Sequence, residues 1–346
     1  MNNRLKHILL AGIAAAGLQQ ATAQDIHFSQ FYETSILRNP SLTGLFTGDY
    51  KVGVVYRNQW SSISKPFQTA LANVEARIPI NEVNDYLSIG VLGYYDRAGS
   101  INLKTTSVYP AINYNKSLED GHNSYLSVGF TAGYIQRSFD PTRATFNNQY
   151  MNNSFNASNP SGENMGNPTI NYWDMGAGVT YSSSTSGEEN ALNYVIGAGA
   201  YHIMKPKTSF YNSSDARLMT RWNGNVAISK QLNQKFSFQI HANYSKQGSY
   251  SEIIGGGMIG WHKYGPNDGL LFVLFGGVFY RYNDAIIPTV KLRYKDLAFT
   301  CAYDLNASKL RVASNMQGGY EISVVKTGLI NSPNREKSRT ICPEFY

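Results

Sequence analysis

The sequence has no run approaching the roughly 20 consecutive apolar residues that a membrane-spanning helix needs. The longest apolar stretch, residues 8–18, follows Arg4 and Lys6 and precedes the small residues Ala21, Thr22 and Ala23. This order predicts a signal peptide over residues 1–23 that is removed before Gln24, and hence an exported protein. A short membrane anchor is the alternative, which the length of the stretch disfavours.

Cysteine is also scarce, with only Cys301 and Cys342, and no CxxC motif occurs. Cys301 lies two residues from both Phe299 and Tyr303, so all three would lie on the lipid-facing side of a strand. We therefore expect two unpaired thiols, the first of them facing lipid. The histidines after residue 23 never fall at metal-ligand spacings, which predicts no metal site and no cofactor. They are His27, His122, His202, His241 and His262.

Charge is low for a protein of this size: 15% of residues are charged, and the net charge is +7. The basic residues are dispersed along the chain and form no compact cluster. Nucleic acid is therefore not an expected partner.

What the sequence does contain is a repeated alternation of apolar and polar residues. In residues 235–246, Phe236, Phe238, Ile240, Ala242 and Tyr244 alternate with polar residues. Such a strand is about 33 Å long and, tilted by about 40°, crosses about 25 Å of hydrocarbon. It is also longer than is usual in soluble sheets, where five or six residues are typical.

Similar segments recur from residue 50 to residue 326, among them 192–204 and 217–230. We count about fourteen, an even number typical of bacterial barrels. The sequence therefore predicts an all-β fold, a transmembrane antiparallel outer-membrane β-barrel. A soluble β-barrel or double sandwich is the alternative.

The connections between these segments differ between the two sides of the predicted membrane. Those on one side are short, whereas the other side contains the longest, residues 137–169, which we predict to be extracellular. Residues 24–49 lack periodicity and form a predicted periplasmic or lumen-docking segment. Residues 327–346 form a predicted periplasmic tail.

Charged residues within the segments oppose the apolar face, so we predict that they point into the lumen. Both signs occur, which favours a paired, partly filled interior over an ion-selective pore. The residues are Lys51, Arg57, Glu75, Arg77, Asp174, Lys291, Arg293 and Glu321.

The long connection alternates asparagines with aromatic residues, including Phe146, Tyr150 and Phe155. Rigid aromatic anchors among adaptable amides are typical of binding surfaces, so these three are candidate partner-binding residues. A solvated loop without a binding role is the other interpretation.

We predict no enzymatic activity. A hydrolase at the barrel rim, using His241 with Ser237 or Ser245, is an alternative, although no nucleophile elbow marks either serine.

Several motifs resemble the PorP/SprF family of type IX secretion and gliding-motility proteins of the Bacteroidetes. The opening matches lie in residues 24–32, 39–44 and 56–60, and the closing matches in residues 303–308, 318–323 and 342–345. The segments between these motifs resemble the family mainly in their general character and not in particular motifs. The family-signature residues are His27, Phe28, Ser29, Gln30, Phe31, Tyr32, Arg57, Gln59 and Trp60.

The resemblance implies an integral outer-membrane barrel that helps secrete, anchor or display large surface proteins, such as adhesins with type B C-terminal sorting domains. It also implies periplasmic type IX secretion or peptidoglycan-linked partners. An outer-membrane solute channel is the main alternative function.

We expect the N-terminal segment to dock in or under the barrel through Phe28, Phe31 and Tyr32. Arg57 and Gln59 would satisfy backbone groups of that segment.

Overall fold

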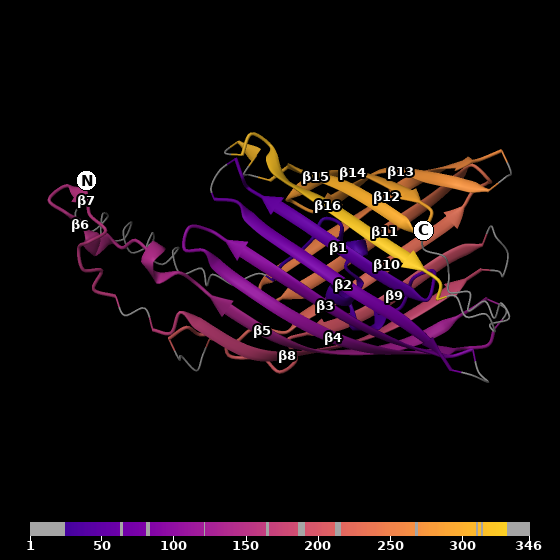
Figure 1. The fold of residues 1–346 in the computed structure, drawn as a ribbon, viewed down its shortest axis with the longest axis horizontal. Coiled ribbons are helices and arrows are strands. Elements are labelled where there is room, and N and C mark those ends of the chain that lie inside the picture. Colours follow the sequence, from indigo (N-terminus) through magenta and orange to yellow (C-terminus); the bar gives the residue numbers. More distant parts are fainter. Residues whose placement is uncertain are drawn as a thin grey trace, which may run out of the picture.

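Fourteen long strands among the described residues form a closed antiparallel barrel in sequence order, with β1 pairing with β16 (Figure 1). The computed structural model describes residues 25–330 except 63–64, 81–83, 121, 164–165, 186–190, 212–215, 267–268, 309–310 and 313. The predicted signal peptide, Cys342 and most of the predicted tail lie outside these residues. The barrel strands are β1 (Tyr50–Gln59), β2 (Phe67–Pro79), β3 (Tyr86–Ala98), β4 (Leu103–Ser117), β5 (Tyr125–Ser138), β8 (Thr169–Ser184), β9 (Leu192–Tyr201), β10 (Arg221–Gln231), β11 (Phe236–Gln247), β12 (Tyr250–Tyr264), β13 (Leu270–Arg281), β14 (Ala285–Tyr294), β15 (Leu297–Asn306) and β16 (Gln317–Gly328).

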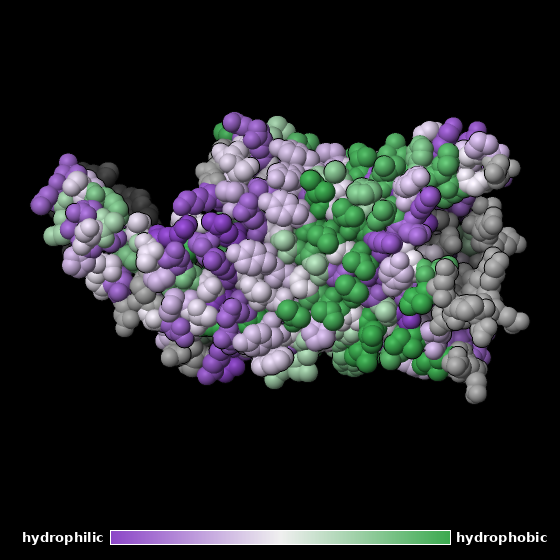
Figure 2. Space-filling view, viewed as in Figure 1, coloured by the Kyte–Doolittle hydropathy of each residue, from purple (hydrophilic) through white to green (hydrophobic). Residues whose placement is uncertain are grey.

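The alternation in sequence separates the outside of the barrel from the lumen. In β11, Phe236, Ile240 and Tyr244 are 41%, 46% and 44% exposed, whereas Ser237 and Gln239 are buried. Such an exterior of large apolar side chains is stable only against lipid. On the face of the barrel that Figure 2 shows, hydrophobic side chains form a green band across the strands, which we call the apolar belt. The prediction of a transmembrane barrel is confirmed.

Aromatic side chains border the apolar belt at both ends. Tyr134 and Trp173 pair at one end, with ring centroids 5.2 Å apart, and Trp261 and Phe272 pair at the other, 5.9 Å apart. Aromatic girdles of this kind mark the two membrane–water interfaces of outer-membrane barrels.

No helix in the described part of the chain is long and apolar enough to cross a membrane. The long connection between β5 and β8 projects from the barrel and contains the hairpin β6 (Tyr150–Met151) and β7 (Ser154–Phe155) (Figure 1). Its base packs on the β9–β10 connection, where the Phe139 and Phe210 rings lie 4.9 Å apart.

Residues 25–49 run through the lumen, and we call them the plug. They contain three short helical turns, η1 (Phe31–Glu33), α2 (Ser35–Arg38) and η2 (Pro40–Leu42). Most of their side chains are buried against the inner wall. The plug joins β1 at the short-turn end, where the Asp49 N–H donates to the Gly328 carbonyl at 2.8 Å.

Two predicted strands are shorter in the structure. The segment 192–204 ends at Tyr201, because His202 adopts a φ of +56° and the chain turns. The segment 217–230 begins as a strand only at Arg221, since Leu218 bonds back to Pro206 within the connection.

Candidate functional site: the plugged lumen and its outer mouth

Glu321 on β16 binds the backbone of the plug directly. Its two carboxylate oxygens accept hydrogen bonds from the Ser29 N–H at 2.6 Å and the Gln30 N–H at 2.8 Å. The side chain is 1% exposed, and Arg57 on β1 forms a buried ion pair with it. A buried carboxylate is stable when it is both charge-paired and hydrogen-bonded.

Asp304 extends this cluster to a second pair of opposite charges. It lies 3.0 Å from Arg57 and 2.6 Å from Arg281, and accepts a bond from the Ser29 hydroxyl at 2.5 Å. Glu321 and Asp304 therefore face two guanidinium groups, and Arg281 also pairs with Asp284 at 2.5 Å. The charges of the cluster are engaged with the plug and with one another.

This arrangement corrects one sequence-based expectation. Arg57 donates to the Ser29 hydroxyl, not to a backbone carbonyl, and Glu321 is the residue that satisfies the plug backbone. Gln59 makes none of the plug's hydrogen bonds among the described residues; it pairs along the wall with Phe67 and Gly319. Trp60 lies at the end of β1, with its ring 5.0 Å from Phe67.

Glu75 on β2 also binds the plug through its carboxylate, nearer the short-turn end of the lumen. It accepts bonds from the Ser35 hydroxyl at 2.6 Å and the Gly44 N–H at 2.8 Å, and Lys51 lies 3.3 Å away. Lys291 pairs with Glu33 of the plug at 3.0 Å. Charged groups on β2, β14 and β16 thus anchor both halves of the plug.

Amide side chains and small wall residues hold the turn at the centre of the plug. Asn113 donates to the carbonyls of Ser41 and Thr43 at 2.9 Å and 2.8 Å, and Asn39 donates to Asn225 at 2.9 Å. Gly129 lets the plug backbone approach, because a Cβ there would lie 2.4 Å from the carbonyl carbon of Pro40. The close fit leaves little room for a through-passage at this level.

The three aromatic residues predicted to dock the plug are placed in the lumen. Phe28 lies in a cluster with Val55, Leu71 and Leu92. Phe31 packs at right angles to the Phe279 ring at 5.8 Å, and Tyr32 stacks on the same ring at 5.1 Å. Hydrophobic packing therefore accompanies the polar anchoring of the plug.

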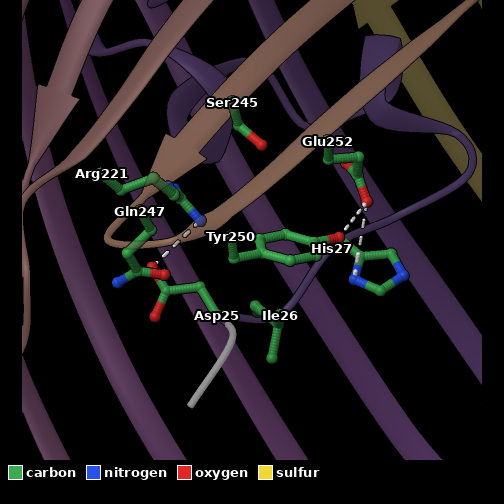
Figure 3. A pocket seen from close by; sticks show the side chains of 8 residues that line it. All are labelled: Asp25, Ile26, His27, Arg221, Ser245, Gln247, Tyr250 and Glu252. Atoms are coloured by element: carbon green, nitrogen blue, oxygen red, sulfur yellow. Dashed lines mark hydrogen bonds and ion pairs between the residues drawn. The ribbon is translucent and has the colours of Figure 1, made fainter. Parts of the chain in front are cut away.

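The N-terminal end of the plug lies in a small pocket at the long-loop end of the lumen (Figure 3). There Arg221 lies 3.2 Å from Asp25, and His27 lies 3.9 Å from Glu252 and 3.3 Å from Arg57. Tyr250 also donates to Glu252 at 3.2 Å. The charges lining the pocket are thus already engaged with one another.

His202 completes the attachment of Asp25. Its Nε2 lies 2.5 Å from Asp25, and its Nδ1 lies 2.8 Å from Asp174, so the ring lies between two carboxylates, which favour its charged form. Burial opposes the charged form, but these carboxylates outweigh burial and raise the pKa of His202 to about 9. For Asp25, burial favours the neutral acid, yet His202 and Arg221 hold its pKa well below the usual range.

The predicted lumen-facing charges do point inward. Lys51, Arg57, Glu75, Arg77, Asp174, Lys291 and Glu321 are buried, and Arg293 is half-buried. Cys301 is exposed on the lipid face and unpaired, as predicted.

The histidine and serines of the hydrolase alternative are not brought together. His241 stacks on Tyr32 at 5.1 Å and lies 3.4 Å from Gln239. Ser237 instead lies 2.8 Å from Nε2 of His262. His241 therefore belongs to the packing around the plug.

The candidate partner-binding residues lie on the projecting connection. Tyr150 and Phe155 face each other in the β6–β7 hairpin and are 56% and 48% exposed, while Phe146 is half-buried. Gln149 orders the connection by donating to the carbonyls of Ala157 and Asn159 at 3.1 Å and 3.3 Å. The hairpin thus presents two aromatic rings on an ordered loop.

Sequence reasoning did not single out Asp304, Arg281, Asn39 or His202 as plug contacts. Alternation alone could have placed Arg281 and Asp304 in the lumen. Their pairing depends on the register around the closed barrel, which no local pattern encodes.

These features define the class: an integral outer-membrane β-barrel whose lumen is filled by its own N-terminal segment. The chain belongs to the family of the type IX secretion system membrane protein PorP/SprF, whose model matches residues 20–325. A comparison with curated proteins gives no match.

Solved structures with a similar fold differ widely in sequence. A Pseudomonas aeruginosa FadL homologue has a TM-score of 0.48 at 9% identity, covering 85% of this chain and 94% of its own. The translocator domain of autotransporter NalP from Neisseria meningitidis has a TM-score of 0.45 at 11% identity, covering 86% and 94%.

Proposed function

We propose that this barrel is a non-enzymatic partner of the type IX secretion system that holds a large secreted protein at the cell surface. The cargo would carry a type B C-terminal sorting domain, as adhesins do. Contact would be made through the loops at the long-loop end, which we assign to the cell exterior because outer-membrane barrels have short periplasmic turns.

The observation that carries the proposal is the combination of a filled lumen with a projecting, ordered loop. The plug occupies the path that a solute would take, which disfavours the solute-channel alternative. Tyr150 and Phe155, by contrast, expose aromatic surface on a loop whose backbone is already ordered by Gln149, so binding would cost little ordering entropy.

Affinity purification of the barrel from mildly solubilised outer membranes tests the proposal. We expect wild-type barrel to recover one large exported protein with a C-terminal sorting domain. The double variant Tyr150→Ser, Phe155→Ser should lower that recovery by about tenfold or more, because two exposed aromatic anchors are lost.

A matched control is Tyr282→Ser, which removes an exposed aromatic side chain from the β13–β14 turn at the same end. It should leave recovery unchanged. Recovery of the barrel alone, together with normal adhesin display in a deletion strain, would exclude the proposed function. If Tyr282→Ser and the double variant lowered recovery equally, the assignment of the hairpin as the contact would be wrong.

A further inference from the structure

Two cationic side chains face each other on the lipid side of the barrel, near its long-loop end. Arg97 on β3 and Lys104 on β4 are directly paired in register. Like charges at directly opposed positions destabilise a sheet. Among the described residues, neither forms an ion pair, so no carboxylate in that part of the chain offsets their mutual repulsion.

Both residues point outward by the alternation of their strands. Arg97 shares a face with Val91 and Tyr95, and Lys104 shares one with Val108 and Ile112; all four of these apolar side chains are exposed to lipid. On the outer face of these two strands, the Arg97–Lys104 pair follows the Tyr95–Thr106 pair in the direction of the long-loop end. Because Tyr95 lies at the end of the apolar belt, the two cations lie at headgroup depth.

The outward positions directly paired with Arg97 and Lys104 are polar and carry no acid. Asp140, whose N–H bonds to Ile101 in the β3–β4 turn, is paired with Arg143 at 2.9 Å. Gln68 is paired with Arg97 on one side, and Ser138 is paired with Lys104 on the other. The nearest carboxylate along the chain, Asp96, has the opposite alternation and accepts a bond from Thr69 at 2.7 Å. Figure 2 shows hydrophilic side chains beyond the green belt at this end of the molecule.

We propose that Arg97 and Lys104 form a binding site for the phosphate groups of a glycolipid in the outer leaflet. A phosphate between the two side chains would convert their repulsion into two charge-assisted contacts, with the guanidinium able to bind two phosphate oxygens. Gln68 and Ser138 supply hydrogen-bonding groups for sugar hydroxyls, and the acyl chains would lie along Val91 and Val108. The site is independent of cargo binding and rests on the assigned orientation.

Native mass spectrometry of the purified barrel in mild detergent, titrated with diphosphoryl lipid A, tests this site. We expect wild-type barrel to retain the glycolipid and Arg97→Gln, Lys104→Gln to bind it about tenfold or more weakly, because each cation near a membrane surface contributes to attraction. Wild-type barrel should bind lipid A that lacks both phosphates no more tightly than the double variant binds diphosphoryl lipid A.

Lys326→Gln is the matched control, because Lys326 is an exposed lipid-facing lysine of β16 at the short-turn end. This variant should bind like wild type. Equal binding by wild type and the double variant, or an equal loss in Lys326→Gln, would overturn the proposal. So would full competition by millimolar inorganic phosphate, which would indicate a site for free phosphate. Unchanged heat-modifiable gel mobility shows that each variant remains folded.

Discussion

At the scale of single residues, buried charges in this barrel bind backbone as well as one another. Glu321 uses both carboxylate oxygens for consecutive N–H groups of the plug and still pairs with Arg57. The plug has no regular sheet partner for these N–H groups, so a wall side chain must satisfy them. This explains why acidic side chains occur inside a lumen that the plug occupies.

Replacing Glu321 with glutamine is predicted to destabilise the protein by roughly 3–5 kcal/mol, the range for breaking a buried charge pair. The amide keeps one acceptor oxygen, so one plug N–H would face an NH₂ donor, and Arg57 would lose its pairing to this group. Urea unfolding in detergent measures the change. Glu163→Gln, on the exposed long connection, is the control and should have no measurable effect.

The His202 attachment predicts that the N-terminal end of the plug loosens at high pH. The pKa of His202 is raised from the ordinary 6.5 to about 9, so its contribution is complete below pH 6.5 and is lost as the pH rises through 9. Hydrogen exchange of the Ser29 and Gln30 amides should therefore accelerate between pH 7 and pH 10. His202→Asn tolerates the positive φ and should show fast exchange already at pH 7. A wild-type exchange rate that merely follows intrinsic base catalysis would contradict this.

At the scale of elements, the strands were predictable and the path of the plug was not. Alternation in residues 235–246 fixed the two faces of β11, because one face must meet lipid and the other must not. The sequence of residues 25–49 has no periodicity, and its conformation is determined by partners on distant strands, such as Glu75, Asn113 and Glu321. For the same reason the alternation of residues 192–204 extends the predicted strand through His202, whereas contacts to Asp25 and Asp174 hold this residue in a turn.

The fit between the plug and the wall predicts opposite outcomes for two glycine substitutions. Gly129→Ala should destabilise the protein by about 1–3 kcal/mol, because the added methyl group would overlap the backbone of Pro40 and Ser41. Gly224→Ala, on β10, should be close to neutral, since a Cβ there meets nothing within 4 Å. Thermal unfolding of both variants in the same detergent makes the comparison. Equal stability of the two would show that the plug is not seated against β5.

At the scale of the whole molecule, the plug crosses the lumen from one mouth to the other. Asp25 is held by His202 near the long-loop end, and Asp49 bonds to Gly328 at the short-turn end. Between these ends, Glu321 on β16 and Glu75 on β2, the two strands that flank β1, anchor the chain. Displacing the plug would break several buried ion pairs together, and each broken pair would leave a buried charge without compensation.

The wild-type protein is therefore expected to show no steady conductance in planar bilayers and no sugar uptake in liposome-swelling assays. Deleting residues 25–44 should open a conducting pore, because the inner wall is lined by polar and charged side chains that water can solvate. The double substitution Glu75→Gln, Glu321→Gln keeps the chain intact and should give brief openings, since both anchors of the plug are weakened. The matched double substitution Glu119→Gln, Glu163→Gln in the connections should stay closed. Steady wild-type conductance at the level of the deletion variant would mean that the plug does not close the lumen, and the solute-channel alternative would then be the better account.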